Sequence, residues 1–306
     1  MADAELRIIC GPTAAGKSAL ALTLADREPT TIISADSRQI YRRFDIGTAK
    51  PTRAERRSVP HRGIDIVEPT ERYSAASWAD EAKGWIAEAL EAGRTPVVVG
   101  GTGFYLRALA MPLFEEPPLD AERRAALADV LASMTVPQLR SWCERLDPPR
   151  AHLGRTQLLR AIEMALLTGQ PISRWHREHA RAPSVRARWL VVNPRPAVLA
   201  RRIEERAEAM VRAGWEEEVR ELVRSVPEDA PAWNATGYRT VRDRVRGTLT
   251  RAAMMARVVV ETRQYAKRQR TWFRHQLPDE RVTSIDPTDA RAIELATRWW
   301  RGGARE

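Results

Sequence analysis

Cysteine is scarce in this chain of 306 residues, which contains only Cys10 and Cys143. The two are too far apart to suggest a clip, and neither has a paired metal-ligand spacing, so a zinc finger is excluded. No apolar run approaches the roughly 18 residues that a membrane-spanning helix needs. The N-terminus is acidic and lacks the basic-then-apolar layout of a secretory signal. We therefore expect a cytoplasmic protein with no membrane partner.

Acidic residues are outnumbered, with 40 Asp and Glu against 50 Lys and Arg, which gives a formal net charge of +10. Such an excess attracts polyanions, chiefly nucleic acid, by a long-range and salt-dependent term. The alternative is an arginine-rich composition inherited from a GC-rich genome. Charge alone leaves both explanations open. The length suits one large α/β domain or a domain with a smaller insertion.

Short apolar segments alternate with longer helical ones in much of the chain. Because these segments show no polar alternation and are separated by helices, they predict a parallel sheet covered by helices on both faces. The predicted strands are residues 6–10, 31–33, 63–67, 96–99 and 189–192. The predicted helices outside the middle of the chain are residues 18–26, 75–92, 197–225 and 251–276.

The middle of the chain has a different pattern. Helical segments at residues 120–133, 137–146 and 156–168 follow one another with no strand signal between them. They predict a small all-helical insertion domain. We therefore expect residues 1–113 to form the first part of an α/β core, residues 114–182 the helical insertion, and residues 183–306 the rest of the core with a basic helix.

A phosphate-binding motif lies between the first predicted strand and its helix. It matches G-x-x-x-x-G-K-[ST] in full, with Gly11, Pro12, Thr13, Ala14, Ala15, Gly16, Lys17 and Ser18. The glycines let the backbone curl so that N–H groups point at phosphate oxygens, and the helix dipole adds to this. Lys17 supplies a point charge, and the Ser18 hydroxyl is the expected ligand of Mg²⁺. The motif thus predicts an α/β fold like that of P-loop NTPases.

Two further groups end predicted strands at the same edge of the sheet. Asp36 follows the second strand, where ligands of parallel sheets gather. It could be a magnesium ligand or a general base. Gly100, Gly101, Thr102 and Gly103 follow the fourth strand, and their glycines allow a ligand to approach closely. These residues do not by themselves distinguish a kinase from another phosphate-binding enzyme.

The ordered set of segments resembles the tRNA dimethylallyltransferase family, also called tRNA isopentenyltransferases. The resemblance is carried by residues 11–18, 33–41, 45–51, 60–66, 73–76, 99–106 and 262–269, and it covers nearly the whole chain. It implies transfer of a five-carbon allylic group from dimethylallyl diphosphate to N6 of the adenine 3′ of a tRNA anticodon. In that reaction Asp36 is implied as the general base and Thr102 as a hydrogen-bonding partner near the diphosphate and the amine. Thr13 and Arg206 are implied donor contacts.

The resemblance also implies a set of contacts to the tRNA anticodon stem-loop. Asp36, Ser37, Arg38 and Gln39 match the segment that holds the acceptor nucleotide, and Gln39 could read a base edge. A second contact is implied for Gly237, Tyr238 and Arg239. Gln157 and Arg160 are expected contacts of the insertion. There the segment 152–157 departs from the family's usual Asn-Asp pair followed by arginine, so Arg155 or Arg160 would have to compensate.

A basic face is expected on the helix predicted over residues 251–276. Arg263, Lys267, Arg270 and Arg274 follow helical spacing, and the opposite face carries Thr262, Ala266, Gln269 and Phe273 among its seating residues. Such a face is either simply solvated or binds RNA phosphates. We expect the second, and a protein that acts as a monomer.

Three other interpretations compete with tRNA prenylation. An enzyme that prenylates free adenine nucleotides should need neither the insertion nor the basic face. A small-molecule kinase should have an arginine-bearing lid over a γ-phosphate, and no segment identifies one. A non-catalytic nucleotide-binding adaptor would leave Asp36 without a task.

Overall fold

The computed structural model describes residues 5–110, 117–178, 185–277 and 281–302. Within these residues the strands form one parallel sheet in the order β3-β2-β4-β1-β5-β6. The strands are β1 Leu6–Cys10, β2 Thr30–Ala35, β3 His61–Arg62, β4 Thr95–Gly100, β5 Ala187–Val192 and β6 Val282–Ile285. The predicted α/β class is confirmed.

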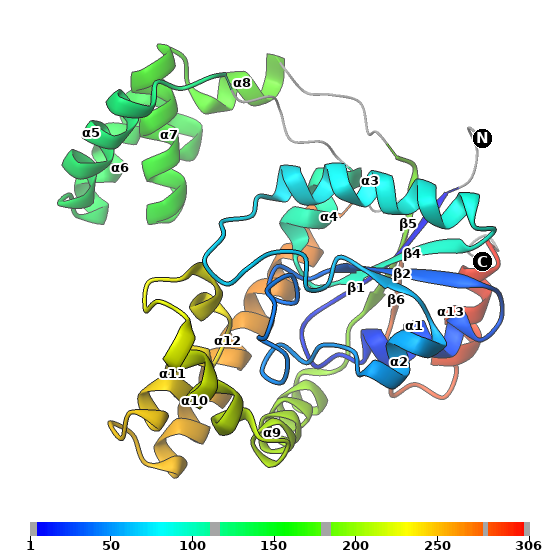
Figure 1. The fold of residues 1–306 in the computed structure, drawn as a ribbon. Helices are drawn as coiled ribbons and strands as arrows, with labels where there is room; N and C mark the ends of the chain where they lie inside the picture. The colour runs from blue at the N-terminus through cyan, green and yellow to red at the C-terminus, as the bar shows by residue number, and fades with distance from the viewer. Residues whose placement is uncertain (1–4, 111–116, 179–184, 278–280, 303–306) are drawn as a thin grey trace. The chain divides into compact units, whose positions relative to one another are not determined.

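Helices cover both faces of this sheet (Figure 1). On one face α1 (Lys17–Ala25) and α13 (Ala292–Trp300) bury Leu24, Ala296 and Trp299 with β-strand residues in one apolar core. On the other face lie α3 (Ala75–Glu91) and α4 (Gly103–Ala110), which contact each other. Burial of these apolar faces fixes the sheet between two helical layers. No described helix is long and apolar enough to cross a membrane.

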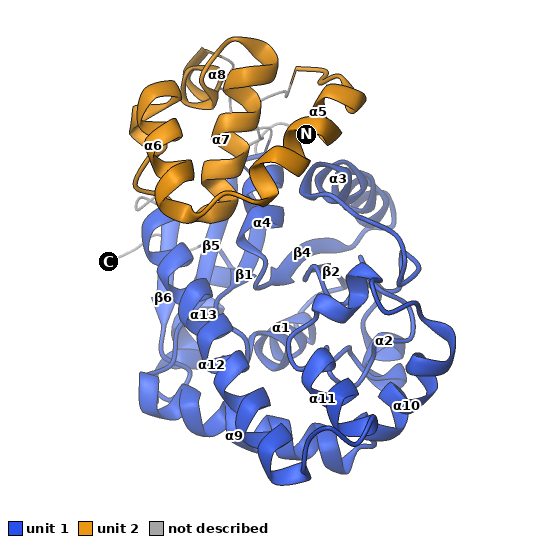
Figure 2. Ribbon diagram, turned by 90° about the vertical axis from the view of Figure 1, so that its left-hand side faces the viewer, with its two compact units in different colours: residues 1–110, 185–306 blue, residues 111–184 orange. Residues whose placement is uncertain are grey.

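The chain divides into two compact units, drawn in different colours in Figure 2. The first comprises Met1–Ala110 and Val185–Glu306, and the second Met111–Ser184. The described part of the second unit is helical and holds α5 Ala121–Ala132, α6 Val136–Leu146, α7 Arg155–Thr168 and α8 Ile172–Glu178 around its own core. The predicted domain limits at 113/114 and 182/183 lie outside the described residues.

Two predicted elements are wrong. The single helix expected over residues 197–225 is two helices, α9 (Pro196–Arg212) and α10 (Trp215–Ser225), because Gly214 has φ 98° and interrupts the helical backbone. The strand expected over residues 63–67 does not form. Gly63 and Asp65 have φ angles of 75° and 57°, which are incompatible with a strand. Asp65 instead pairs with the buried Lys50 ammonium.

The first unit also contains α2 Arg53–Ser58, α11 Tyr238–Val245 and α12 Arg251–Gln276. The bounds of α12 agree with its prediction. Packing of α12 against α9 and α11 holds it beside the loops at the carboxyl edge of the sheet.

Tyr238 belongs to a buried aromatic cluster with Phe44, Trp215 and Trp233. Its side chain is 0% exposed, so its expected contact with tRNA does not fit this arrangement. The hydroxyl donates to Glu218 Oε1 at 2.7 Å and accepts from the Gly47 amide at 3.1 Å. Glu218 also accepts from the Asp45 and Ile46 amides. Tyr238 thus helps to hold the 45–47 loop against α10.

We predict that Tyr238→Phe lowers the free energy of unfolding by about 1–3 kcal/mol, because the Gly47 amide and Glu218 lose a buried partner. Urea unfolding measures the change. Arg239→Ala removes the neighbouring exposed side chain and should stay within about 0.5 kcal/mol of the parent. Equal stability of Tyr238→Phe and the parent would show that this hydroxyl does not hold the loop.

Candidate active site

The register of the sheet brings three loops to one place. Gly100 of β4 pairs with Cys10 of β1 on one side and with Ala35 of β2 on the other. The next residues, Gly11, Asp36 and Gly101, therefore leave the carboxyl edge side by side. Ligands of parallel α/β sheets bind at this edge. The site is thus set by strand pairing before any side chain contributes.

The loop of residues 11–18, called the glycine loop below, needs glycine at its start. Gly11 has φ 142°, and a Cβ there would lie 2.3 Å from the Val192 carbonyl oxygen. Gly16 has φ 100° and is the N-cap of α1. Ala14 also lies in the left-handed region, with φ 60°. This curled backbone turns the loop into the N-terminus of a helix, which is a favourable place for an anion.

Lys17 stands in the first turn of α1 and folds back over the loop. Its Nζ donates to the Pro12 carbonyl at 2.7 Å. Burial lowers the pKa of the ammonium to about 8, an effect that the Asp36 carboxylate opposes and Arg206 reinforces. A bound anion would hold Lys17 in its charged form.

Helix α9 sends two arginines to the glycine loop. Arg202 Nη1 donates to the Ala15 carbonyl at 2.9 Å, and Arg206 Nη1 donates to Thr13 Oγ1 at 3.3 Å. Burial lowers the pKa of Arg206, and Asp36 opposes that shift. Arg206 therefore contacts the glycine loop, and its role as a donor contact, implied by the family resemblance, stays a prediction. Arg202 was not expected there, although it stands four residues before Arg206 and so shares its helix face.

Asp36 is held by its own segment. Its Oδ1 accepts from the Arg38 amide at 2.9 Å. Thr102 Oγ1 accepts from the Ser37 amide at 2.9 Å, so Thr102 supports the turn that carries Asp36. In the structure Thr102 lines neither cavity described below. It lies beside the site as a support of residues 36–38.

The Gln39 amide is engaged inside the protein. Its Oε1 accepts from Ser34 Oγ at 2.9 Å, and its Nε2 donates to the carbonyls of Thr48 and Ala49 at 3.2 and 3.1 Å. With both ends of the amide in use, the expectation that Gln39 reads a base edge does not fit this arrangement. Gln39 instead ties the 36–39 segment to the 45–49 loop.

Two cavities meet at this edge of the sheet. The first is lined by the glycine loop, with Lys17 and Ser18 among its residues, and by Arg202 and Arg206 of α9. The second has apolar walls that include Ile203, Met210 and Trp215. Both cavities are lined by Thr13, Asp36 and Arg206.

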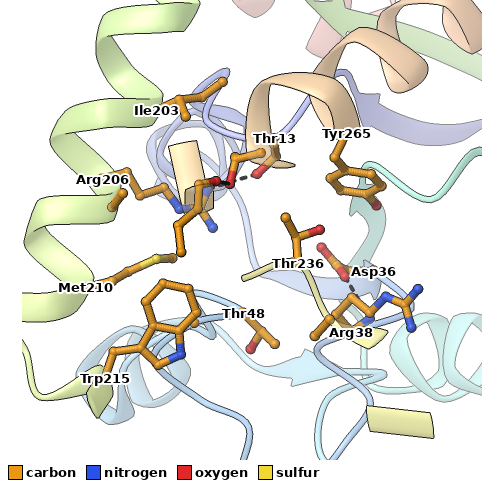
Figure 3. A pocket seen from close by; sticks show the side chains of 15 residues that line it. Thr13, Asp36, Arg38, Thr48, Ile203, Arg206, Met210, Trp215, Thr236 and Tyr265 are labelled. Carbon is orange, nitrogen blue, oxygen red and sulfur yellow. Dashed lines mark hydrogen bonds between the residues drawn. The ribbon is translucent and has the colours of Figure 1, made fainter. Parts of the chain in front are cut away.

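Figure 3 shows the second cavity from close by. Arg206, Ile203 and Met210 come from α9 on one side, and Asp36, Arg38 and Tyr265 lie on the other. Burial raises the pKa of Tyr265 to about 12, so its phenol is neutral at pH 7. An apolar group between these walls would have the Arg206 guanidinium on one side and the Asp36 carboxylate on the other.

The donor set for a metal is small. No group of three or more His, Cys, Asp or Glu side chains in the described residues could hold an ion. Ser18 is exposed in the first turn of α1 and lines the first cavity, as does Asp36. Mg²⁺ keeps several waters and commonly binds through one or two protein oxygens together with phosphate oxygens. The residues present fit that mode of binding.

The predicted RNA-binding cations lie on α12, but their surroundings differ. Arg263 forms an ion pair with Glu204 of α9. Lys267 and Arg274 are exposed and Arg270 is half-buried. These four line a groove whose other wall is formed by Pro196, Leu199, Ala200 and Ile203 of α9.

The remaining expected RNA contacts are partly engaged. Gln157 is exposed on α7 of the helical unit. Arg160 forms an ion pair with Glu163. Arg155 donates to the Leu131 and Ala132 carbonyls at the end of α5, so it serves the local fold. Gly237 has φ 86° and faces the Trp215 ring closely. Arg239 is exposed and donates to Asn234 Oδ1 at 2.7 Å.

Gln269 of α12 is a site residue that sequence reasoning missed. Its Oε1 accepts from the Thr13 amide at 2.8 Å, and its Nε2 donates to the Gly101 carbonyl at 2.8 Å. From the sequence it is expected only to seat the helix. The one available signal is a long amide side chain at a seating position, beside the apolar Ala266 and Phe273.

Comparison with known proteins agrees with this geometry. Residues 39–276 match the IPP transferase family, and residues 4–64 match the isopentenyl transferase family. A tRNA dimethylallyltransferase of Halorhodospira halophila is 42% identical over 302 residues, covering 96% of this chain and 97% of the relative.

Solved structures are similar as well. The tRNA isopentenylpyrophosphate transferase of Bacillus halodurans is 32% identical with a TM-score of 0.71, covering 98% of this chain and 96% of its own. A eukaryotic dimethylallyltransferase acting on tRNA shares the fold with a TM-score of 0.81 at 24% identity, covering 99% of this chain and 81% of its own. The family match, the full-length relative and the shared fold agree: the chain belongs to the tRNA dimethylallyltransferase family of prenyltransferases.

Proposed function

We propose that this protein transfers a dimethylallyl group from dimethylallyl diphosphate to N6 of the adenine immediately 3′ of the anticodon in a tRNA, releasing diphosphate. The observation that supports this most is the junction of the two cavities. Thr13, Asp36 and Arg206 line both, so the glycine loop and a carboxylate border both cavities.

The first cavity, lined by Lys17, Arg202 and Arg206, suits the diphosphate. Breaking the allylic C–O bond leaves negative charge on the leaving group, and fixed positive partners stabilise that charge in the transition state. The amides of the glycine loop, the N-terminus of α1 and the Lys17 ammonium are such partners. Arg206 stands where the diphosphate meets the carbon chain, between the loop and the apolar wall.

Mg²⁺ would be held by the Ser18 hydroxyl, with phosphate oxygens and water completing its ligands. When bound, it neutralises part of the charge on the diphosphate. The chain's own contribution is to place this hydroxyl beside Lys17 in the first turn of α1.

The second cavity suits the five-carbon chain of the donor and the adenine of the acceptor. We assign its α9 wall, with Ile203, Ala207 and Met210, to the five-carbon chain, and the side with Asp36, Arg38 and Tyr265 to the extruded adenine. The N6 lone pair forms the new C–N bond while the C–O bond electrons pass to the diphosphate. One N–H proton passes to the Asp36 carboxylate. That transfer matters because the adenine amine is a poor nucleophile, its lone pair being delocalised into the ring.

The RNA would contact cations outside the cavities. Lys267, Arg270 and Arg263 line one groove, and long-range attraction between such cations and phosphates is salt-dependent. We further assign Ser37, Arg38, Gly237 and Arg239 beside the site, and Gln157 and Arg160 on the helical unit, to the anticodon stem-loop. The adenine must leave the loop stack to reach Asp36. We propose that one chain suffices for these contacts.

The alternative substrate is a free adenine nucleotide. Such an enzyme would need the cavities but not the helical unit or the groove cations. The presence of both features favours an RNA acceptor. The kinase interpretation is less favourable. A kinase would bind a polar phosphoryl acceptor beside the phosphates, whereas the second cavity has apolar walls there.

A transfer assay separates these functions. With labelled dimethylallyl diphosphate and Mg²⁺, the protein should label a tRNA anticodon stem-loop whose first base 3′ of the anticodon is adenine. The same stem-loop with guanine at that position should stay unlabelled, as should AMP. Labelling of AMP at a comparable rate would favour the free-nucleotide enzyme, and no labelling of any acceptor would reject the proposal.

Asp36→Asn should lower the single-turnover transfer rate by about 10²–10⁴-fold, because the amide cannot accept the N6 proton. The affinity for the stem-loop, measured by filter binding, should stay within about twofold, since the amide keeps the oxygen that the Arg38 amide contacts. Asp229→Asn, at an exposed position, is the matched control and should transfer at the parent rate. Equal losses of transfer and RNA affinity in Asp36→Asn would instead indicate a structural or metal-binding role.

A further inference from the structure

The side chain of Gln269 is polar and buried, and its hydrogen bonds go to residues outside its own helix. It is 6% exposed, and its amide oxygen and nitrogen each contact a different loop, at Thr13 and Gly101. Buried polar groups are normally hydrogen-bonded, so satisfaction alone would not be unusual. The unusual feature is that one side chain bonds to two loops whose contact residues, Thr13 and Gly101, are 88 residues apart in sequence.

The neighbouring glycines show how closely α12 approaches the second loop. A Cβ at Gly101 would lie 2.4 Å from Gln269 Nε2 and 3.2 Å from the Gly11 carbonyl oxygen. A Cβ at Gly103 would lie 2.3 Å from the Trp272 ring. The backbone of residues 101–103 is therefore seated directly on α12. Glycine at these positions permits the contact that Gln269 makes.

Each of the two loops leads to a different reactant. On one side, Thr13 accepts a hydrogen bond from Arg206 and lines both cavities. On the other side, Gly101 is followed by Thr102, whose hydroxyl holds the Ser37 amide next to Asp36. A shift of either loop relative to Gln269 would change the separation between the donor site and the carboxylate.

The contact also limits which amides can bind an anion. Because the Thr13 N–H already donates to Gln269, it is not free for a phosphate oxygen. The Ala15 N–H is also engaged, since it donates to the Pro12 carbonyl. The diphosphate would then be held by the amides of Ala14 and of residues 16–18.

We propose that Gln269 is a positioning residue for group transfer, which sets the glycine loop at a fixed distance from the turn that carries Asp36. This inference rests on the proposed function and adds a residue to it. Gln269 lines the cavity assigned to the diphosphate, and both ends of its amide are bonded to the two loops. It acts through Thr13 on the donor side and through Gly101 and Thr102 on the acceptor side, and misplacement by about 1 Å can cost about 10²-fold in rate.

The test compares three substitutions with a control on the same helix. Gln269→Leu removes both hydrogen bonds, Gln269→Asn keeps the amide but withdraws it by one methylene, and Gln269→Glu keeps an acceptor for Thr13 but no donor for Gly101. Gln264→Leu changes an exposed glutamine and is the control. The readouts are the single-turnover transfer rate at saturating substrates, the affinity for inorganic diphosphate with Mg²⁺, the affinity for the stem-loop, and the melting temperature.

We expect Gln269→Leu and Gln269→Asn to transfer about 10²-fold more slowly, with stem-loop affinity within about twofold of the parent. Gln269→Glu should be slowed as well, and its affinity for diphosphate should fall further because a carboxylate is added beside the loop. Gln264→Leu should match the parent. If Gln269→Leu does not fold, the Asn and Glu variants still decide the question.

The contrary result is a lower melting temperature with a parent-like transfer rate, which would make Gln269 an ordinary stabilising residue. In that case the parent protein still transfers the label, and only the inference on Gln269 fails. If the parent itself transfers nothing while inorganic diphosphate binding still weakens in Gln269→Leu, the proposed function fails and the loop contact stands.

Discussion

The pairing of β4 with β1 and β2 is the constraint on which the rest of the site depends. Gly100 stands between Cys10 and Ala35, so the glycine loop, Asp36 and the 101–103 segment leave the sheet as neighbours. Parallel strands meet at one edge only when helices cross over between them, and here those helices also bury the sheet. The side chains of the site therefore inherit their positions from backbone hydrogen bonds.

The charges at this edge are unbalanced. Lys17 and Arg206 both have a pKa that burial lowers, and the Asp36 carboxylate acts against both shifts. One carboxylate facing two desolvated cations is a poor neutralising partner, and an incoming diphosphate would supply the remaining negative charge. In the proposed reaction this excess of positive charge stabilises the negative charge of the departing diphosphate. Asp36 remains close enough to accept a proton.

The sequence predicted those parts of the site that are local or obey an edge rule. The glycine loop is a contiguous motif, and Asp36 follows a strand end, so both were found from residue order. Arg206 came from the family resemblance, and the structure places it on Thr13. The bounds of α12 follow from its long apolar and basic periodicity.

Contacts between distant segments were not predictable in the same way. Nothing in the order of residues indicates that Gln269 forms hydrogen bonds with both Thr13 and Gly101. The same holds for the hydrogen bonds of the Gln39 amide with Ser34 and Thr48. Tyr238 was assigned to the RNA because its neighbours resemble a contact, whereas packing with Phe44 and Trp215 buries it. The break at Gly214 was missed because a single glycine is tolerated in many helices, and only its positive φ ends this one.

A crystal structure of the protein with inorganic diphosphate, Mg²⁺ and an anticodon stem-loop measures the central geometry directly. The account predicts the diphosphate on the amides of the glycine loop, and the adenine amine within hydrogen-bond distance of the Asp36 carboxylate. A diphosphate bound elsewhere, or an adenine that reaches the site on a side closed off from Asp36, would contradict it.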